Sequence, residues 1–393
     1  MSGVACLRYL AGKLPDAKVS HACQFPDPPA GAIRQNLHPV HAGNADPIRH
    51  PGLFTVAGRS RERLRVAMAR MARAFGLCDL GDIRWGALAK VTAHSNEFER
   101  AYERLADEDS RTLMVQLTAY RVLGHRRYRL AVAQRYRDAL ADAGRARLRV
   151  AGTHRDALIG VLDEFDLTPF GAEVALQCHR TDIAHTWLMQ QYRFERGGHQ
   201  IGASPGETVI DCGGCWGDTA LYFAHRVGPE GSVICYEFEP GNLAILHRNL
   251  ALNPELAERI RVFERAVWSN DASTLRFSSN SVATTLSEEA DEDGGDKRVC
   301  TDSIDAMVER EGLARVDFIK MDIEGAEMEA LAGAVRTISR HRPKLAISAY
   351  HRPDDIWRLS GYIDGLGLGY RFRLDHFTIH EEETVLFCDT ANR

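Results

Sequence analysis

The chain has 393 residues, of which 45% are hydrophobic and 26% are charged, and its formal net charge is −5. These values are ordinary for a soluble globular protein of two or three domains, and they show no overall bias toward nucleic acid or anionic membrane. No apolar run reaches the about 18 residues that a membrane span needs, and the first residues lack the pattern of a secretory signal. We therefore expect a cytoplasmic protein that binds neither nucleic acid nor membrane.

The first half of the chain predicts an arm followed by a mostly helical region. Residues 1–52 are rich in proline and have little periodicity, which indicates a loosely ordered arm. Helical spacing follows at Leu64, Met68, Met71 and Phe75. Further helices are expected from 109 to 124, with a cap at 109–110, and from 130 to 144, followed by short strands at 148–151 and 174–178. We interpret 53–195 as an accessory or cap domain.

The stretch 208–223 organises the second half of the chain. A β-branched run ends at Asp211, glycines follow at Gly213, Gly214 and Gly217, and a helical run begins at 218–219. Strand, glycine turn and helix in this order bring backbone close to a nucleotide-like ligand in doubly wound α/β sheets. The spacing differs from that of dinucleotide folds, and a carboxylate at the strand end suits a ligand with a cationic amino-acid end. The pattern favours S-adenosylmethionine, and a turn that needs glycine for steric reasons alone is the alternative.

Strands and helices alternate after residue 208, which predicts a parallel sheet with crossover helices. The second strand, 232–236, leads to Glu239, whose carboxylate can accept hydrogen bonds from both hydroxyls of a ribose. The third strand and its edge, 261–263 and 266–268, include Ala266 and Val267, where we expect an adenine to lie. Residues 275–277 indicate a hairpin insertion, and the acidic run 288–296 indicates a charged loop.

Acids and a histidine follow the next two predicted strands. The strand 316–322 ends at Asp322 with Glu324 close behind, and the strand 345–350 ends at His351. Because the carboxyl ends of parallel strands meet at one edge of a sheet, these three side chains are expected to converge. Residues 370–377 and 384–389 are predicted to form a terminal antiparallel hairpin.

Three motifs together resemble the FkbM-type family of S-adenosylmethionine-dependent methyltransferases. They are Val-Ile-Asp-Cys-Gly-Gly-Cys-Trp-Gly-Asp-Thr, Glu-Phe-Glu-Pro with Asn242 behind it, and Asp-Phe-Ile-Lys-Met-Asp-Ile-Glu-Gly-Ala-Glu. The resemblance covers roughly residues 205–389, within a predicted methyltransferase domain at 196–393. It implies an α/β class I methyltransferase fold, with a seven-stranded, Rossmann-like sheet whose last strand is antiparallel. It also implies methyl transfer to a hydroxyl of a sugar or a natural-product scaffold.

The resemblance also implies roles for individual residues. Asp211, Gly213 and Gly217 correspond to the surroundings of the methionine part of the cofactor, Glu239 to the ribose ligand, and Asp322 and Glu324 to the transfer site. The turn departs from the family's commoner Gly-Ala-Asn pattern. The full set of expected cofactor-binding residues is Asp211, Gly213, Gly214, Gly217, Thr219, Glu239, Asn242, Ala266 and Val267.

Methyl transfer to a hydroxyl requires in-line positioning and removal of the acceptor's proton. His351 is the first candidate base, because imidazole titrates near neutral pH, and His376 is the second. Asp322 and Glu324 complete the expected catalytic set. Mg²⁺ held by these two acids together with the acids at 354–355 is a less favoured alternative, and no residue is assigned as a metal ligand.

The sequence does not specify the acceptor, because the first 195 residues lie outside the resemblance. We expect a small molecule or glycoside as the partner, and a homodimer through the N-terminal domain stays an open arrangement. The competing function is a non-catalytic binding module, in which a methyltransferase fold acts through its helical N-terminal half.

Overall fold

The computed structural model describes residues 87, 90–91, 93–124, 128–156, 160–278, 285–287 and 297–390. The chain divides into two compact units, Met1–Gln134 with Thr378–Glu383, and Arg135–Phe377 with Thr384–Arg393. The predicted arm, the predicted helical face at 64–75 and the acidic run 288–296 lie outside the described residues. None of the helices in the described part of the chain is long and apolar enough to cross a membrane.

The first unit contains α5 (Ser95–Arg104) and α6 (Glu108–Leu123). Helix α6 was predicted from its apolar spacing, and it ends at Gly124 as expected. Its N-cap is Asp107, however, and not the predicted 109–110 pair, because the Asp107 carboxylate accepts a hydrogen bond from the Ser110 amide at 2.8 Å. Acids stand at both 107 and 109, so the sequence alone does not distinguish the two caps.

The second unit includes a small antiparallel sheet that the sequence indicated only in part. Helix α7 (Ala133–Ala146) runs past the expected stop at Gly144 and leads into β1 (Arg147–Asp156), β2 (Gly160–Asp166) and β3 (Ala175–Cys178). The central strand β2 was not predicted. A short 3₁₀ helix, η4 (Thr168–Phe170), connects β2 to β3. Residues 135–195 therefore group by packing with the C-terminal half of the chain.

Two asparagines of α10 (Pro240–Leu252) and its C-cap hold the small sheet through β3. The Asn249 side chain accepts from the Gln177 amide at 2.7 Å and donates to the Gln177 carbonyl at 2.8 Å. Asn253 pairs in the same way with the backbone of Ala175, at 3.0 and 2.6 Å. Each carboxamide thus makes the two hydrogen bonds that a neighbouring strand would make, so that the backbone amides and carbonyls at the edge of β3 are paired.

The main sheet has seven strands in the order β15-β16-β14-β13-β6-β7-β8. Strand β16 pairs antiparallel with both of its neighbours, and the other pairings are parallel. This arrangement confirms the predicted sheet of seven strands with an antiparallel last strand, and it confirms the terminal hairpin. The strands are β6 (Thr208–Cys212), β7 (Ser232–Tyr236), β8 (Ile260–Phe263), β13 (Phe318–Met321), β14 (Lys344–Ser348), β15 (Tyr370–His376) and β16 (Thr384–Thr390).

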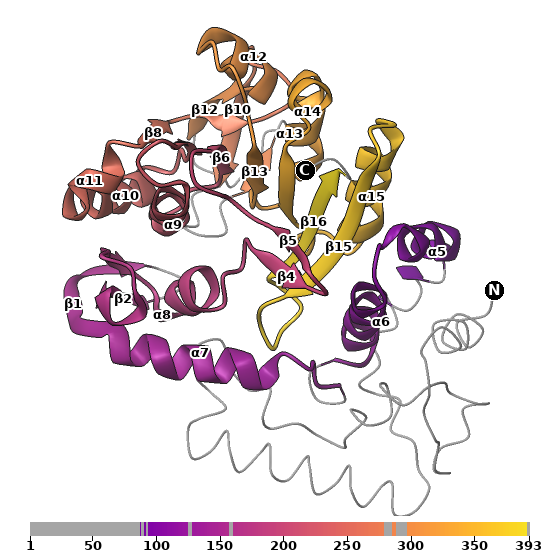
Figure 1. Cartoon of the computed structure of the whole chain (residues 1–393), viewed down its shortest axis with the longest axis horizontal. Coiled ribbons are helices and arrows are strands. Elements are labelled where there is room, and N and C mark those ends of the chain that lie inside the picture. Colours follow the sequence, from indigo (N-terminus) through magenta and orange to yellow (C-terminus); the bar gives the residue numbers. More distant parts are fainter. Residues whose placement is uncertain are drawn as a thin grey trace, which may run out of the picture. The chain divides into compact units, whose positions relative to one another are not determined.

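Helices connect and flank these strands. Helices α9 (Asp218–Val227) and α11 (Pro254–Ala257) pack beside β8, and α15 (Asp355–Gly365) lies at the other end of the sheet, beside β15 (Figure 1). Helix α13 (Glu327–Ala332) and α14 (Val335–His341) join β13 to β14, and α12 (Ile304–Arg310) precedes β13. Strand β13 is buried along its whole length and β6 from its second residue onward, as expected of parallel strands covered on both faces.

A second sheet interrupts the alternation after β8. Its order is β11-β10-β12-β9, formed by β9 (Ala266–Val267), β10 (Thr274–Ser278), β11 (Thr285–Ser287) and β12 (Arg298–Asp302). The antiparallel pairing of β10 with β11 confirms the predicted hairpin insertion. Ala266 and Val267 were expected at the edge of the third strand, but they pair with β12 in this separate sheet. A tight turn separates β8 from β9, in which the Arg265 amide donates to the Phe263 carbonyl at 2.9 Å.

Before the main sheet, the chain passes through a short irregular helix and a small hairpin. Helix α8 (Arg180–Asp182) continues into η5 (Ile183–Leu188), which has π-helical hydrogen bonding. Strands β4 (Phe194–Arg196) and β5 (His199–Ile201) form the hairpin. We call residues 180–192 the entry segment, because it leads the chain into the main sheet. π-Helical turns are rare and frequently occur at functional sites.

Candidate active site

Four neighbouring parallel strands present their carboxyl ends at one edge of the main sheet. Cys212 of β6 pairs with Met321 of β13, which in turn pairs with Ile347 of β14. The residues that follow these strands are therefore adjacent in space, in the position where open α/β sheets bind their ligands. Strand β7 completes the set on the other side of β6.

The glycine turn after β6 packs tightly against the neighbouring strands. Gly213 has φ +89°, and a Cβ atom there would lie 2.0 Å from the Asp322 carbonyl oxygen. A Cβ at Gly214 would lie 2.1 Å from the Cys235 Sγ. The amides of Gly213 and Gly214 both donate to the Tyr236 carbonyl, at 3.0 and 2.8 Å. Steric need accounts for these two glycines, and it brings the turn directly against the end of β13.

A buried ion pair supports the turn from below. Lys320 lies 3.0 Å from Asp211 Oδ1 and donates to the carbonyls of Cys212 and Gly213 at 3.1 and 2.5 Å. The other carboxylate oxygen of Asp211 accepts from the Thr219 hydroxyl at 2.7 Å. Burial lowers the pKa of Lys320, but the negative charges of Asp211, Asp322 and Asp218 together outweigh this effect, so that the pKa of Lys320 is raised and the amine stays protonated.

This arrangement differs from the direct cofactor contacts expected of Asp211 and Thr219. Asp211 has no exposed surface, and both of its oxygens are engaged within the protein. Its geometry suits a role in shaping the turn. Lys320 was not assigned a role from the sequence, although a lysine inside an apolar strand was a usable signal, since a buried lysine requires a partner.

Two glutamates lie after β7, and they make different contacts. Glu239 caps α10, accepting from the Asn242 amide at 2.8 Å, and Pro240 occupies the first helical position. Glu237 accepts from the amides of Phe238 and Glu239 at 2.6 and 2.8 Å. Burial raises the pKa of Glu237 to about 7, against the effect of these hydrogen bonds. Glu239, the residue that the sequence predicted to bind the ribose, thus lies at the start of α10.

Asn242 connects this end of the site to the glycine turn. Its side-chain oxygen accepts from Trp216 Nε1 at 3.1 Å, and its amide nitrogen lies 3.4 Å from Glu237 Oε2. The Trp216 carbonyl in turn accepts from Asn249 at 2.8 Å. Asn242 and Asn249 therefore hold the turn, the start of α10 and the small sheet in one network.

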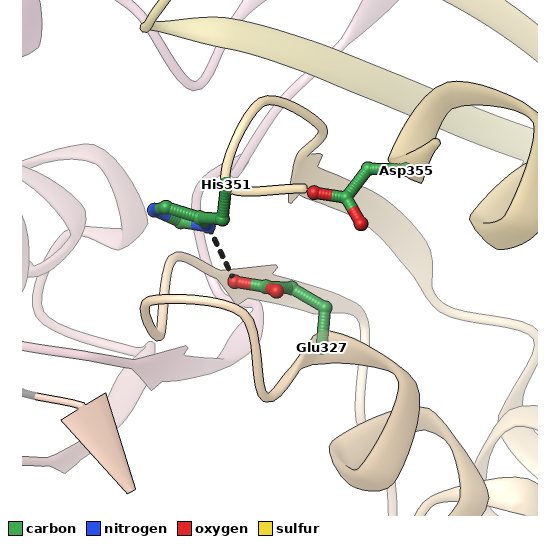
Figure 2. Close-up of side chains that lie close together, drawn as sticks. All are labelled: Glu327, His351 and Asp355. Carbon is green, nitrogen blue, oxygen red and sulfur yellow. Dashed lines mark ion pairs between the residues drawn. The ribbon is translucent and has the colours of Figure 1, made fainter. Parts of the chain in front are cut away.

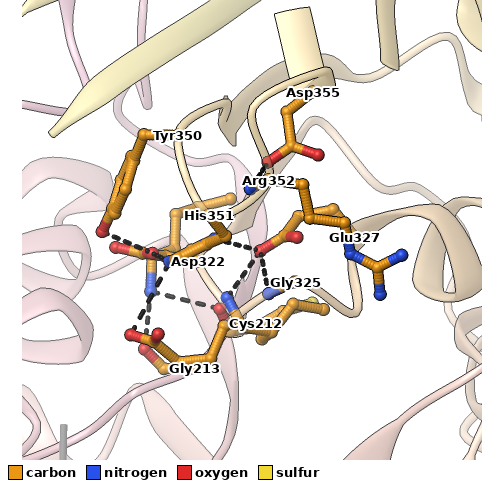
Figure 3. A network of polar contacts seen from close by, with 12 residues as sticks. Cys212, Gly213, Asp322, Gly325, Glu327, Tyr350, His351, Arg352 and Asp355 are labelled. Carbon is orange, nitrogen blue, oxygen red and sulfur yellow. Dashed lines mark hydrogen bonds and ion pairs between the residues drawn. The ribbon is translucent and has the colours of Figure 1, made fainter. Parts of the chain in front are cut away.

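His351 lies among three carboxylates. Its Nδ1 is 2.9 Å from Glu327 Oε1, and its Nε2 is 3.3 Å from Asp322 Oδ1 (Figure 3). The same Nε2 is 3.6 Å from Glu324 Oε1. Burial disfavours the charged imidazole, but the hydrogen bonds to these acids outweigh it and raise the pKa of His351 well above its usual value. The three predicted residues Asp322, Glu324 and His351 do converge. The raised pKa favours the protonated ring, which donates and does not accept a proton, so the base role of His351 stays a prediction.

Asp322 is held by two tyrosines in addition to His351. The Tyr192 hydroxyl donates to Oδ2 at 2.8 Å, and the Tyr350 hydroxyl donates to Oδ1 at 3.1 Å. Burial raises the pKa of Asp322, but His351, Lys320 and Tyr192 together outweigh this effect and lower it. Asp322 is therefore ionised across the neutral range. Neither tyrosine was predicted, since a lone tyrosine carries no sequence signal for such a role.

Glu324 is the most exposed of the three acids around His351. Its side chain is 31% exposed, against 18% for Asp322 and 1% for Glu327. Its φ of +54° lies in the left-handed region, which is unfavourable for a residue with a Cβ. Among the described residues, Gln190 and Cys215 also have positive φ, and they too lie in segments that reach this edge. Such backbone strain is often concentrated at functional sites.

Glu327, His351 and Asp355 form a second cluster behind the site, with one ligand atom of each within 4.8 Å of the others (Figure 2). The atom types would suit a metal ion. Glu327 Oε1, however, also accepts from the amides of Ile323 and Gly325 at 3.0 and 3.4 Å, and the Arg352 amide donates to Asp355 at 2.6 Å. Within the protein, these contacts make the cluster an ion pair and hydrogen-bond network that orients the imidazole.

His376, the second candidate base, lies in a different part of the sheet. It is at the end of β15, and its Nδ1 is 2.9 Å from the Thr384 hydroxyl of β16, its partner in the strand register. Strands β16 and β14 separate it from β13, a distance of about 14 Å at the usual strand spacing. The structure does not bring His376 into the Asp322–His351 cluster, so its catalytic role stays a prediction, and its contact with Thr384 supports the hairpin.

Comparison with known proteins agrees with this geometry. Residues 200–374 match the model of the methyltransferase FkbM domain. An FkbM methyltransferase from Methylobacillus flagellatus KT is similar in structure, with 22% identity, a TM-score of 0.51, and coverage of 85% of this chain and 71% of that chain. Residues 200–374 are therefore an FkbM methyltransferase domain, and the main sheet has the class I methyltransferase fold, as the sequence motifs predicted.

Two other solved structures are similar over part of their length. An S-adenosylmethionine-dependent O-methyltransferase from Thermotoga maritima has 15% identity, a TM-score of 0.32, and coverage of 49% of this chain and 62% of that chain. Fibrillarin from Aeropyrum pernix, with bound S-adenosylmethionine, has 12% identity, a TM-score of 0.31, and coverage of 62% and 98%. The curated proteins contain no match to the sequence.

Proposed function

We propose that the protein is an S-adenosylmethionine-dependent methyltransferase that methylates a hydroxyl of a small molecule, such as a sugar or a natural-product scaffold. The observation that carries the proposal is the convergence of three groups at one sheet edge of a methyltransferase fold. These groups are the glycine turn after β6, the Glu239 carboxylate after β7, and the Asp322–His351 cluster after β13 and β14. Each corresponds to one need of the reaction: close backbone approach, a ribose ligand and a polar transfer site.

The charges at this edge fit the cofactor. S-adenosylmethionine carries an ammonium group, a sulfonium and a ribose diol, which are matched by carboxylates and carbonyl oxygens. Glu239 provides a carboxylate, and a Cβ at Gly241 would lie 2.7 Å from its Oε2, so glycine keeps space beside it. The turn amides of Gly213 and Gly214 are already bonded to Tyr236, which disfavours a phosphate ligand. Ala266 and Val267 remain our proposed boundary of the adenine.

The residues after β13 are suited to handle the acceptor. When bound, the cofactor supplies a methyl group on a positively charged sulfur. The protein has to hold the acceptor oxygen in line and take its proton. We assign the proton to Glu324, because it is the most accessible of the acids around His351. Glu324 would accept the proton of the acceptor hydroxyl as the methyl group is transferred, and would then release it to water.

Calorimetric titration of the full chain with S-adenosylmethionine and S-adenosylhomocysteine tests the proposal. Wild type is expected to bind both. Glu239→Gln, which removes the charged acceptor of the ribose, is expected to weaken both about 10- to 100-fold. Glu230→Gln, at an exposed turn, is the matched control and should bind as wild type does. Absence of binding by wild type, with or without Mg²⁺, would overturn the proposal and favour the binding-module alternative.

A further inference from the structure

Tyr192 lies outside the family domain and contacts two charged residues, Lys320 in β13 and Asp322 directly after it. The domain match begins at residue 200, and Tyr192 lies in the entry segment before it. Its hydroxyl donates to Asp322 Oδ2 at 2.8 Å, and its ring centroid lies 5.3 Å from Lys320 Nζ. One side chain therefore contacts both the carboxylate of the transfer site and the cation beneath the glycine turn.

Hydrogen bonds hold the entry segment at two points before Tyr192. The Thr186 hydroxyl donates to Asp218 Oδ2 at 3.0 Å, at the start of α9. Arg135 donates to the Met189 carbonyl at 2.6 Å. The π-helical turn η5 and the positive φ of Gln190 direct the chain from these anchors to Tyr192. Strained geometry that several contacts maintain is often associated with function.

The contacts of Asp322 leave room for one more hydrogen bond. Oδ1 interacts with Tyr350 and His351, whereas Oδ2 accepts from Tyr192. Because each carboxylate oxygen has two acceptor positions, Oδ2 retains one. The direction of that position depends on Tyr192, since the other two partners bind the opposite oxygen.

We propose that Tyr192 is a positioning residue of the transfer site, which orients Asp322 toward the bound cofactor and shields the Lys320–Asp211 pair with its ring. The inference rests on the proposed function, because it concerns the same ligand. It extends the site to a segment outside the family domain. The entry segment is then required for cofactor binding, and a chain truncated to the family domain lacks one of the side chains that hold Asp322.

Three variants of the full chain test this role. Tyr192→Phe removes the hydroxyl and keeps the ring, and Tyr192→Leu removes both. Tyr370→Phe is the control, because it removes a buried tyrosine hydroxyl that donates to the Pro343 carbonyl, away from Asp322. Binding of S-adenosylmethionine and S-adenosylhomocysteine is measured by calorimetry between pH 5 and 9, and thermal unfolding is followed without ligand.

Tyr192→Phe is expected to lower the affinity for S-adenosylmethionine about tenfold. The affinity for S-adenosylhomocysteine should fall less, because only S-adenosylmethionine carries the sulfonium charge. Loss of the hydroxyl also removes one of the donors that lower the pKa of Asp322, so the acid limit of binding is expected to move to higher pH. The other groups that act on Asp322 are His351, Lys320, Tyr350 and Asp211, and they are unchanged. Tyr192→Leu should also lower the unfolding temperature, because it exposes Lys320.

The outcomes separate the two proposals. If wild type binds the cofactor and Tyr192→Phe matches Tyr370→Phe in affinity and in its acid limit, the positioning role is wrong. A lower unfolding temperature with unchanged affinity would also refute it, since that is the behaviour of a structural hydroxyl. If wild type binds neither ligand, the proposed function itself fails, and this inference fails with it.

Discussion

Replacement of Lys320 by methionine tests the electrostatic support of the glycine turn. Lys320 is 1% exposed and lies 3.0 Å from Asp211, which is fully buried. Methionine fills a similar volume but leaves the Asp211 charge without its partner. Breaking a buried pair from one side costs about 3–5 kcal/mol. At about 2–4 °C per kcal/mol for a domain of this size, the unfolding midpoint should fall by about 6–20 °C.

The pH dependence of this loss identifies its cause. Burial raises the pKa of Asp211, and Lys320 opposes that effect, so Lys320→Met should raise the pKa further. A carboxyl whose folded pKa exceeds its unfolded value, about 3.9, binds more protons in the folded state. The stability of the variant should therefore fall as the pH rises above about 4 and should recover on acidification.

Urea unfolding of wild type, Lys320→Met and Lys320→Met/Asp211→Asn, at several pH values, measures the effect. The double variant has no buried charge at this position, and it should recover most of the lost stability at neutral pH. A single variant within about 1 kcal/mol of wild type would refute the reasoning, because that is the size of an exposed ion pair. So would a double variant that is no more stable than the single one.

Three further predictions follow from contacts near the site. In thermal unfolding, the control Gly228→Ala should cost about 1–2 kcal/mol of stability, because this glycine has a positive φ but open space around it. Gly213→Ala should cost several times more, because a Cβ there would also lie 2.0 Å from a backbone oxygen. Wild type should exceed His351→Gln in stability most below about pH 6.5, with the difference shrinking as the pH rises through the raised folded pKa; a constant difference from pH 5 to 9 would contradict this. Asn249→Ala should cost about 1–3 kcal/mol and speed hydrogen exchange at the Gln177 amide, and unchanged exchange would argue against the asparagine pairing.

The sequence predicted the main sheet well because its strands carry strong local signals. The strands beginning at Thr208, Ser232 and Phe318 are mostly apolar, which is the pattern of parallel strands buried on both faces. Strand β2 was missed because it contains acids at 163, 164 and 166 and forms an antiparallel sheet, where pairing and not burial on both faces decides the structure. The N-cap of α6 was misplaced because acids at both 107 and 109 can cap a helix, and only the backbone geometry selects Asp107.

Within the site, sequence determined which residue types stand at the strand ends, and hence that Asp322, Glu324 and His351 meet. It did not determine their protonation. Whether an imidazole is a base or a fixed cation depends on how many carboxylates lie within a few ångströms, and Glu327 joins His351 only through the turn into α13.

The chain's own order of residues therefore determined the class of fold, the glycine turn and the acids that follow the strands, because these depend on local spacing and on strand order. Only the tertiary structure decided that Asp211 is held by Lys320, that His376 lies three strands from β13, and that Tyr192 reaches Asp322 from 130 residues earlier in the chain. The physical reason is that charge and hydrogen bonding act over a few ångströms in space, whatever the separation along the sequence.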